Sequence, residues 1–185
     1  MYNQRLLEYR FSWFTLLSDL ATEIKINRMM FFPLVNGSNL LREKLTLPRD
    51  FKGKLNLVFI AFEQWHQMEV DSWMLLARKL EDQFDGLVYY ELPTIENRNS
   101  FLRMFINEGM RAGIPNPKTR ERTITLYLDI KEFRAALDLP DEEHICVLLV
   151  DPQGKEYFRA RGAYNPDLEA ALRQTISQLA LKARP

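Results

Sequence analysis

The sequence is poor in the residues that carry covalent and phosphate-binding chemistry. Its 185 residues include a single cysteine, Cys146, so the chain cannot form an intramolecular disulfide. It has only two histidines and seven glycines, and none of the glycines forms a phosphate-binding loop motif. No Ser–His–Asp signature and no cluster with metal-ligand spacing is present. The sequence therefore argues against the common nucleotide-binding, triad-hydrolase and zinc-site classes.

Neither sign of charge is in excess. The 25 basic and 25 acidic residues cancel, which removes the electrostatic argument for nucleic acid or an anionic membrane as the main partner. The basic run Lys118, Arg120 and Arg122 is interrupted by Glu121 and contains no aromatic residue, so we interpret it as a solvated loop. A single cysteine fits a reducing compartment. We therefore expect no nucleic-acid partner and a cytoplasmic location.

The first 32 residues contain no apolar run near the roughly 20 residues of a membrane span. Glu8, Asp19 and Glu23 are unlike a transit peptide, which is poor in acids. We expect no stable membrane insertion, and a helical extension over residues 1–30 that packs on the protein, on a second copy as a homo-oligomer, or on a partner. Its apolar face consists of Leu6, Tyr9, Trp13, Leu16, Leu17, Leu20 and Ile24.

From residue 31 to 185 the chain alternates strand and helix patterns and is predicted to be one domain. Leu55–Phe62 is a continuous apolar run, typical of a central parallel strand covered on both faces. An amphipathic helix follows, and Leu87–Leu92 supplies the next strand of a right-handed βαβ unit. The apolar positions of that helix are Val70, Trp73, Met74, Ala77, Leu80 and Phe84.

Turn-forming and helix-capping residues predict where the remaining elements begin and end. Asn36-Gly37-Ser38 predicts a turn before an edge strand at Leu40–Leu47. Asp151-Pro152-Gln153-Gly154 predicts a hairpin turn, and Asn165-Pro166 predicts the start of a final helix. The other expected elements are a helix over 98–112, a basic loop Gly113–Arg122, strands Thr123–Leu128, Ile145–Val150 and Glu156–Arg161, and a helix Lys131–Leu137.

The entry features Phe32-Pro33, Gly37, Leu47 and Gly53-Lys54, with the closing run ICVLLVDPQGKEYFRARG, resemble the thioredoxin-like superfamily, which includes the peroxiredoxins. Over residues 31–180 the chain also resembles the mitochondrial ATP synthase assembly factors of that superfamily. The features that match those factors are Gln67, Ser72-Trp73, Tyr127-Leu128 and Phe133-Arg134. The resemblance implies an α/β thioredoxin-like fold, with a central mixed β-sheet flanked by helices and an extra N-terminal helix. It also implies a non-catalytic assembly-helper role.

Trp65, His66, Gln67 and Met68 stand where this resemblance places the Cys-x-x-Cys of redox-active members. Disulfide exchange needs a thiolate at a helix N-terminus and a second thiol that resolves the mixed disulfide. Trp65 and Met68 can supply neither. We therefore predict a redox-inactive module that uses this position to bind a protein. The helix N-terminus itself is a position suited to a carboxylate or phosphate.

An enzyme or metal carrier remains the alternative from another class. By the same resemblance, His144 lies close to where thioredoxins place a cis-proline facing the cysteines. His66 and His144 would then approach one another, with Glu63 or Glu69 near, as a metal site or an acid–base pair. The simpler interpretation, two partly exposed and hydrogen-bonded histidines, is the one we adopt. We therefore expect no metal, no cofactor and no catalytic residue.

Cys146 is surrounded by apolar residues in His144-Ile145-Cys146-Val147-Leu148-Leu149. A free cysteine in such surroundings acts as a small hydrophobic residue with a raised pKa and low reactivity. A divergent thiol oxidoreductase or peroxidase would instead need Cys146 to be accessible. We expect Cys146 to be part of the core.

Overall fold

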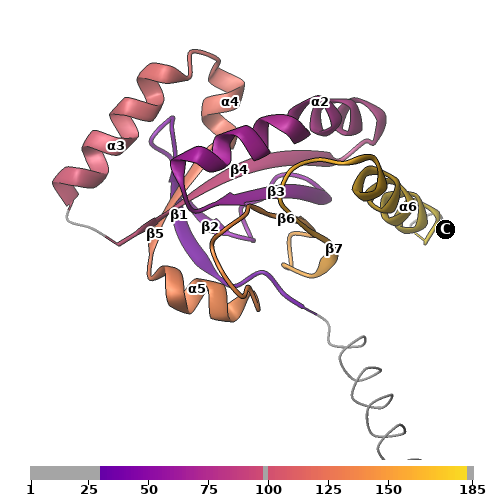
Figure 1. Ribbon diagram of the computed structural model, residues 1–185. Coiled ribbons are helices and arrows are strands. Elements are labelled where there is room, and N and C mark those ends of the chain that lie inside the picture. The colour runs from indigo at the N-terminus through magenta and orange to yellow at the C-terminus, as the bar shows by residue number, and fades with distance from the viewer. Residues whose placement is uncertain (1–29, 98–99, 183–185) are drawn as a thin grey trace, which may run out of the picture. The chain divides into compact units, whose positions relative to one another are not determined.

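The computed structural model (Figure 1) describes residues 30–97 and 100–182. The helix predicted over residues 1–30 lies outside the described residues, except for Met30. Within the two described ranges, no helix is both long and apolar enough to cross a membrane.

A seven-stranded mixed sheet forms the centre of the domain, with strand order β2-β1-β5-β4-β3-β6-β7. Strands β3, β4 and β5 are parallel to one another, and the remaining neighbours pair antiparallel. The strands are β1 Val35–Asn39, β2 Lys44–Leu47, β3 Leu55–Ala61, β4 Leu87–Glu96, β5 Ile124–Leu128, β6 Cys146–Val150 and β7 Glu156–Arg161. This mixed sheet flanked by helices confirms the predicted α/β class.

Helices α2 and α6 cover one face of the sheet, and α5 packs against the other (Figure 1). The helices are α2 Gln67–Gln83, preceded by the 3-10 turn η1 Gln64–His66, and α3 Ser100–Gly113, α4 Pro117–Arg122, α5 Ile130–Ala136 and α6 Pro166–Lys182. Leu172 and Ile176 bury the inner side of α6, and Phe133 buries that of α5. The two faces of the sheet therefore carry separate halves of the hydrophobic core.

Strand β3 is central because both of its faces are covered. Leu57, Val58, Phe59 and Ile60 have no exposed surface. Successive side chains of a strand point to opposite faces, so this apolar run fills both halves of the core. Phe59 packs against Trp73 of α2, with ring centroids 6.1 Å apart. This packing fixes the helix that carries the candidate site.

The sequence prediction for the first hairpin is wrong in detail. Asn36, Gly37 and Ser38 lie inside β1, and a turn after Asn39 separates β1 from β2. Gly37 is required by close packing, since a Cβ there would come within 2.7 Å of the Leu126 side chain. The Asn39 side chain accepts the backbone N–H groups of residues 41 and 43, which stabilises the turn.

The region predicted as the basic loop Gly113–Arg122 contains helix α4. Asn116 accepts the N–H groups of Lys118 and Thr119, and Pro117 occupies the first turn. This arrangement is a normal helix start for Asn followed by Pro. The predicted β6–β7 hairpin is confirmed, and Gly154 takes a positive φ of 86° in its turn.

Candidate binding site at the start of helix α2

The four residues Trp65–Met68 lie where strand β3 passes into helix α2. Glu63 is extended, the 3-10 turn begins at Gln64, and α2 begins at Gln67. Trp65 is 49% exposed and Met68 is 73% exposed, whereas His66 is completely buried. This position therefore presents two large apolar side chains to solvent and turns the histidine between them inward.

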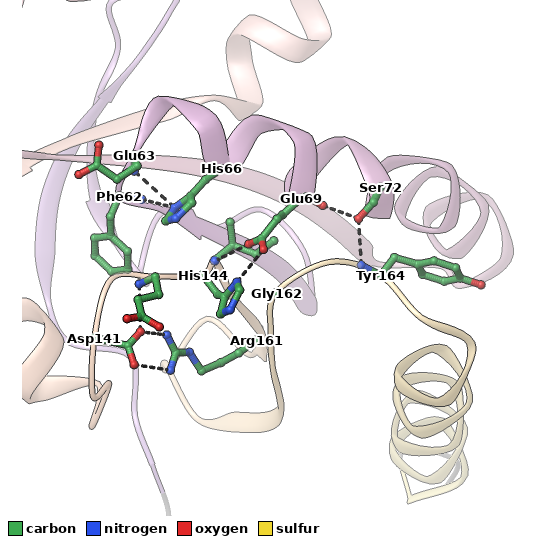
Figure 2. A network of polar contacts seen from close by, with 12 residues as sticks. Phe62, Glu63, His66, Glu69, Ser72, Asp141, His144, Arg161, Gly162 and Tyr164 are labelled. Carbon is green, nitrogen blue, oxygen red and sulfur yellow. Dashed lines mark hydrogen bonds and ion pairs between the residues drawn. The ribbon is translucent and has the colours of Figure 1, made fainter.

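His66 is locked in its neutral form by the backbone. Its Nδ1 accepts the N–H of Phe62 at 3.1 Å and that of Glu63 at 3.4 Å, so the ring proton belongs on Nε2 (Figure 2). Burial lowers the pKa of His66 below its usual value. The expectation of a partly exposed His66 is wrong, because the turn Phe62–His66 holds the imidazole ring against its own backbone N–H groups, where it is buried.

His144 is held by Glu69 from the first turn of α2. Its Nδ1 lies 2.7 Å from Glu69 Oε1, and the other carboxylate oxygen accepts the N–H of Ile145 at 2.9 Å (Figure 2). The His144 side chain is 53% exposed and that of Glu69 is 14% exposed. Glu69 thus joins α2 to the loop that precedes β6. The sequence predicts only that Glu63 or Glu69 lies near the histidines, and not the contact with Ile145.

The two histidines lie at the same end of α2. Burial has the largest effect on the pKa of His66, and the charge of His144 has a small further lowering effect. However, the Nδ1 atoms already bind other groups, His66 to the backbone and His144 to Glu69. A substrate could not exchange a proton with His66 in this conformation, because its ring has no contact with solvent. Within residues 30–97 and 100–182, no group of three or more His, Cys, Asp or Glu side chains is arranged to hold a metal ion.

The N-terminus of α2 carries its own negative charges. Glu63 is the N-cap residue of the preceding 3-10 turn η1, and Glu69 belongs to the first turn of α2. Carboxylates at this end of a helix interact favourably with its dipole. They would also repel an incoming anion, so the geometry does not favour the carboxylate or phosphate ligand considered from the sequence.

The loops beside the site are held by several long-range side-chain contacts. Trp73 Nε1 donates to the carbonyl oxygen of Gly162 at 3.0 Å, and Ser72 Oγ accepts the N–H of Tyr164. Arg161 of β7 forms a two-point ion pair with Asp141 (Figure 2). No local sequence pattern predicts these contacts, since their partners are 20 to 92 positions apart.

Cys146 lies in the middle of the sheet. It pairs with Ile60 of β3 and Arg161 of β7 and has no exposed surface. Burial raises the pKa of the Cys146 thiol to about 12. A thiol in this environment is neither ionised nor reachable at neutral pH, so Cys146 cannot stand in for a catalytic cysteine in this conformation.

The fold is that of the thioredoxin-like proteins: a central parallel strand leads into a helix, and an antiparallel hairpin and a final helix follow. The structure is similar to a thiol:disulfide interchange protein from Bacteroides sp., with a TM-score of 0.55 and 21% sequence identity. That match covers 79% of this chain and 88% of the other.

Two Sco structures match in the same way. The first is BsSco, a member of the Sco family of cytochrome c oxidase assembly proteins, with a TM-score of 0.56, 15% identity, and coverage of 81% of this chain and 94% of that chain. The second is yeast Sco1, with a TM-score of 0.55, 15% identity, and coverage of 84% and 97%. No protein-family model matches the chain, and no curated protein matches its sequence. These similarities confirm the predicted thioredoxin-like fold.

Proposed function

We propose that this chain is a thioredoxin-fold module without dithiol chemistry, which binds a protein and assists its assembly. The observation that carries the proposal is the pair of exposed apolar side chains, Trp65 and Met68, at the position where redox-active members hold their cysteines. The one thiol of the chain, that of Cys146, is buried in the sheet, so no thiol is available at positions 65–68. We call Trp65 and Met68 the apolar site.

The apolar site is presented on a rigid frame. The Trp65 ring packs edge-on against His66, with centroids 4.2 Å apart and an interplanar angle of 78°. His66 is in turn held by the backbone of Phe62 and Glu63. A side chain that is already ordered loses little entropy on binding, and tryptophan is the residue type most enriched among binding hot spots.

The surroundings of the apolar site suit a protein surface better than a small molecule. Small-molecule sites are typically concave. Three cavities among the described residues are lined by other parts of the domain, and none of them includes Trp65, His66, Met68 or His144. An exposed apolar site outside a cavity is the usual geometry of a protein contact.

The assembly-helper role has two supports outside the site. One is the resemblance of residues 31–180 to the ATP synthase assembly factors. The other is the similarity in fold to BsSco, whose family is named for cytochrome c oxidase assembly. We propose the general role of holding a client protein, and a cytoplasmic location for it.

Affinity co-purification from the native host tests this function. The chain and a Trp65→Ala/Met68→Ala variant would be compared, with Leu181→Ala as the matched control because Leu181 is exposed on α6, away from the site. We expect a specific client with the unmodified chain and with Leu181→Ala, and its loss in the double variant. A client retained at full level by the double variant would refute the role assigned to the apolar site.

A further inference from the structure

We propose that the β2–β1–β5 end of the sheet holds a second site, which binds a small molecule that carries a phosphate group. The site is a hollow of about 440 Å³ on one face of these three strands. It is separate from the apolar site and does not depend on it. The polar residues that line this polar hollow are Asn36, Ser38, Lys44, Thr46, Thr125 and Tyr127.

The strand pairing arranges these residues in two rows. Ser38 of β1 pairs with Lys44 of β2 on one side and with Thr125 of β5 on the other, so the three form one row across the sheet. Asn36 pairs with Thr46 in the next row. Residues two positions apart in a strand point to the same face, so both rows present their side chains to the same side of the sheet.

This face of β2, β1 and β5 belongs to neither half of the hydrophobic core. The half of the core under α2 and α6 is formed with residues of β3, β4, β6 and β7. The apolar residues of the β2–β1–β5 end, such as Leu45, Ile124 and Leu126, point to the opposite face, which α5 covers. The polar hollow is therefore a surface of its own, and packing of the core does not account for its residues.

Thr125 is the most informative residue of the polar hollow. It is fully buried as a residue, and its hydroxyl has no hydrogen-bond partner in the described parts of the chain. A buried hydroxyl without a partner is unfavourable, because it has lost its hydrogen bonds to water. A ligand that places an oxygen acceptor beside Thr125 would remove this cost.

The charge of the polar hollow is positive. Lys44 is exposed and forms no ion pair with another described residue, and no Asp or Glu lines the hollow. The neighbouring carboxylates are engaged elsewhere. Glu43 and Asp50 line a different cavity, and Glu108 is paired with Arg42 at 3.0 Å. An anionic ligand would consequently meet an unpaired ammonium group.

These donors fit a phosphate group better than other anions or a sugar. Adjacent strands are about 4.8 Å apart, so an anion above Ser38 is within reach of the Thr125 hydroxyl and of the long, flexible Lys44 side chain. A phosphate monoester offers three acceptor oxygens to these three donors, whereas a carboxylate offers two. A neutral sugar would leave the ammonium group unpaired.

The second row suits the organic part of such a ligand. Asn36 Oδ1 already accepts the Thr46 hydroxyl at 3.0 Å, so the Asn36 side chain keeps its N–H groups to donate. Tyr127 adds an aromatic ring beside them. The volume lies within the range of about 300–1,000 Å³ that is typical of small-molecule sites, and it exceeds what a phosphate ion alone would fill.

A titration followed by amide NMR of the full chain tests the inference. The probes would be phenyl phosphate, inorganic phosphate as the ion without an organic part, and phenol as the ring without a charge. We expect saturable shifts of amides in β1, β2 and β5 with phenyl phosphate, weaker binding of inorganic phosphate, and no binding of phenol.

Two variants separate binding from folding. Lys44→Gln should weaken phenyl phosphate by at least about tenfold, since a charge-assisted contact is lost. Its matched control is Lys131→Gln, because Lys131 is exposed on α5 at the other face, and this variant should bind as the unmodified chain does. Thr125→Val should also weaken binding by about tenfold, while Tm stays the same or rises because a buried hydroxyl without a partner is removed.

Several results would overturn the inference. Shifts that spread over exposed lysines without saturation would show general anion attraction only. Unchanged affinity in Lys44→Gln or in Thr125→Val would reject the assigned donors, and equal affinity for inorganic phosphate or for phenol would reject a phosphate ester as the ligand. Trp65→Ala/Met68→Ala should bind phenyl phosphate normally, so a failure at the apolar site and a failure here are seen separately.

Discussion

Replacement of Glu69 should loosen the loop that precedes β6. In Glu69→Ala, the N–H of Ile145 and Nδ1 of His144 both lose their carboxylate partner. Ile145 is fully buried as a residue, so its N–H would have no ready replacement for the lost acceptor. The variant therefore tests whether Glu69 organises the site or merely lies beside it.

The size of the effect follows from the two contacts. A hydrogen bond to a charged group contributes ~1.5–3 kcal/mol, and this range applies to the Ile145 contact because Glu69 is largely buried. The His144 contact is discounted to ~0–1 kcal/mol because that side chain is half exposed. We expect a total loss of ~1.5–4 kcal/mol in the free energy of unfolding, or a fall in Tm of roughly 3–16 °C for a domain of this size.

Denaturant unfolding monitored by tryptophan fluorescence would give the free energies. We expect Glu69→Ala to be the most destabilised variant. The free energy of unfolding should fall by ~1 kcal/mol in Glu69→Gln, which keeps one acceptor oxygen, and by less than ~1 kcal/mol in His144→Ala. Hydrogen exchange at the Ile145 amide should accelerate in Glu69→Ala.

Asp82→Ala is the matched control, because Asp82 is an exposed carboxylate on the same helix and should change stability by less than ~0.5 kcal/mol. A loss below that level in Glu69→Ala, or an equal loss in His144→Ala, would refute the account of Glu69.

The remaining predictions concern three other positions. Cys146 should react with a thiol reagent only at the rate of unfolding, since its pKa is raised to about 12, and fast labelling of folded protein would contradict its burial. The pKa of His66 is lowered in the folded protein, so the unfolded chain binds the imidazole proton more readily, and stability should fall as the pH drops below ~6.5. His66→Asn should lose this pH dependence, and an unchanged pH profile in the variant would reject the assignment. Gly162→Ala should lower the free energy of unfolding by ~1–2 kcal/mol, because the φ of Gly162 is +80° although a Cβ there would meet no close atom. Gly109→Ala in α3 should be neutral or stabilising, and thermal unfolding of both variants would show whether backbone conformation alone requires glycine at position 162.

Local pattern was enough to predict most of the domain. The apolar run of β3 and the spacing of Val70, Trp73, Ala77 and Leu80 predict elements whose burial depends on hydrophobicity alone. The first hairpin was misplaced because Gly37 serves close packing against β5, and only the three-dimensional pairing shows that. In a sequence, a glycine can indicate either a turn or a close packing contact, and the sequence alone does not distinguish the two.

The candidate site was predicted less completely than the fold. The absence of cysteine at Trp65–Met68 could be read directly from the sequence. The burial of His66 could not, since it depends on a tight turn that directs two backbone N–H groups at the ring. The contact of Glu69 with Ile145 spans 76 positions, and no periodic pattern indicates a contact of that kind.

Site-specific photo-crosslinking tests the central claim, that the apolar site binds a protein. Met68 would be replaced by a photoreactive phenylalanine in the native host, and Leu181 would be replaced in the same way as the comparison, because both side chains are exposed. We predict a defined crosslinked client from position 68 that disappears with Trp65→Ala and does not form from position 181. Absence of a crosslink at position 68, or the same products from both positions, would contradict the account.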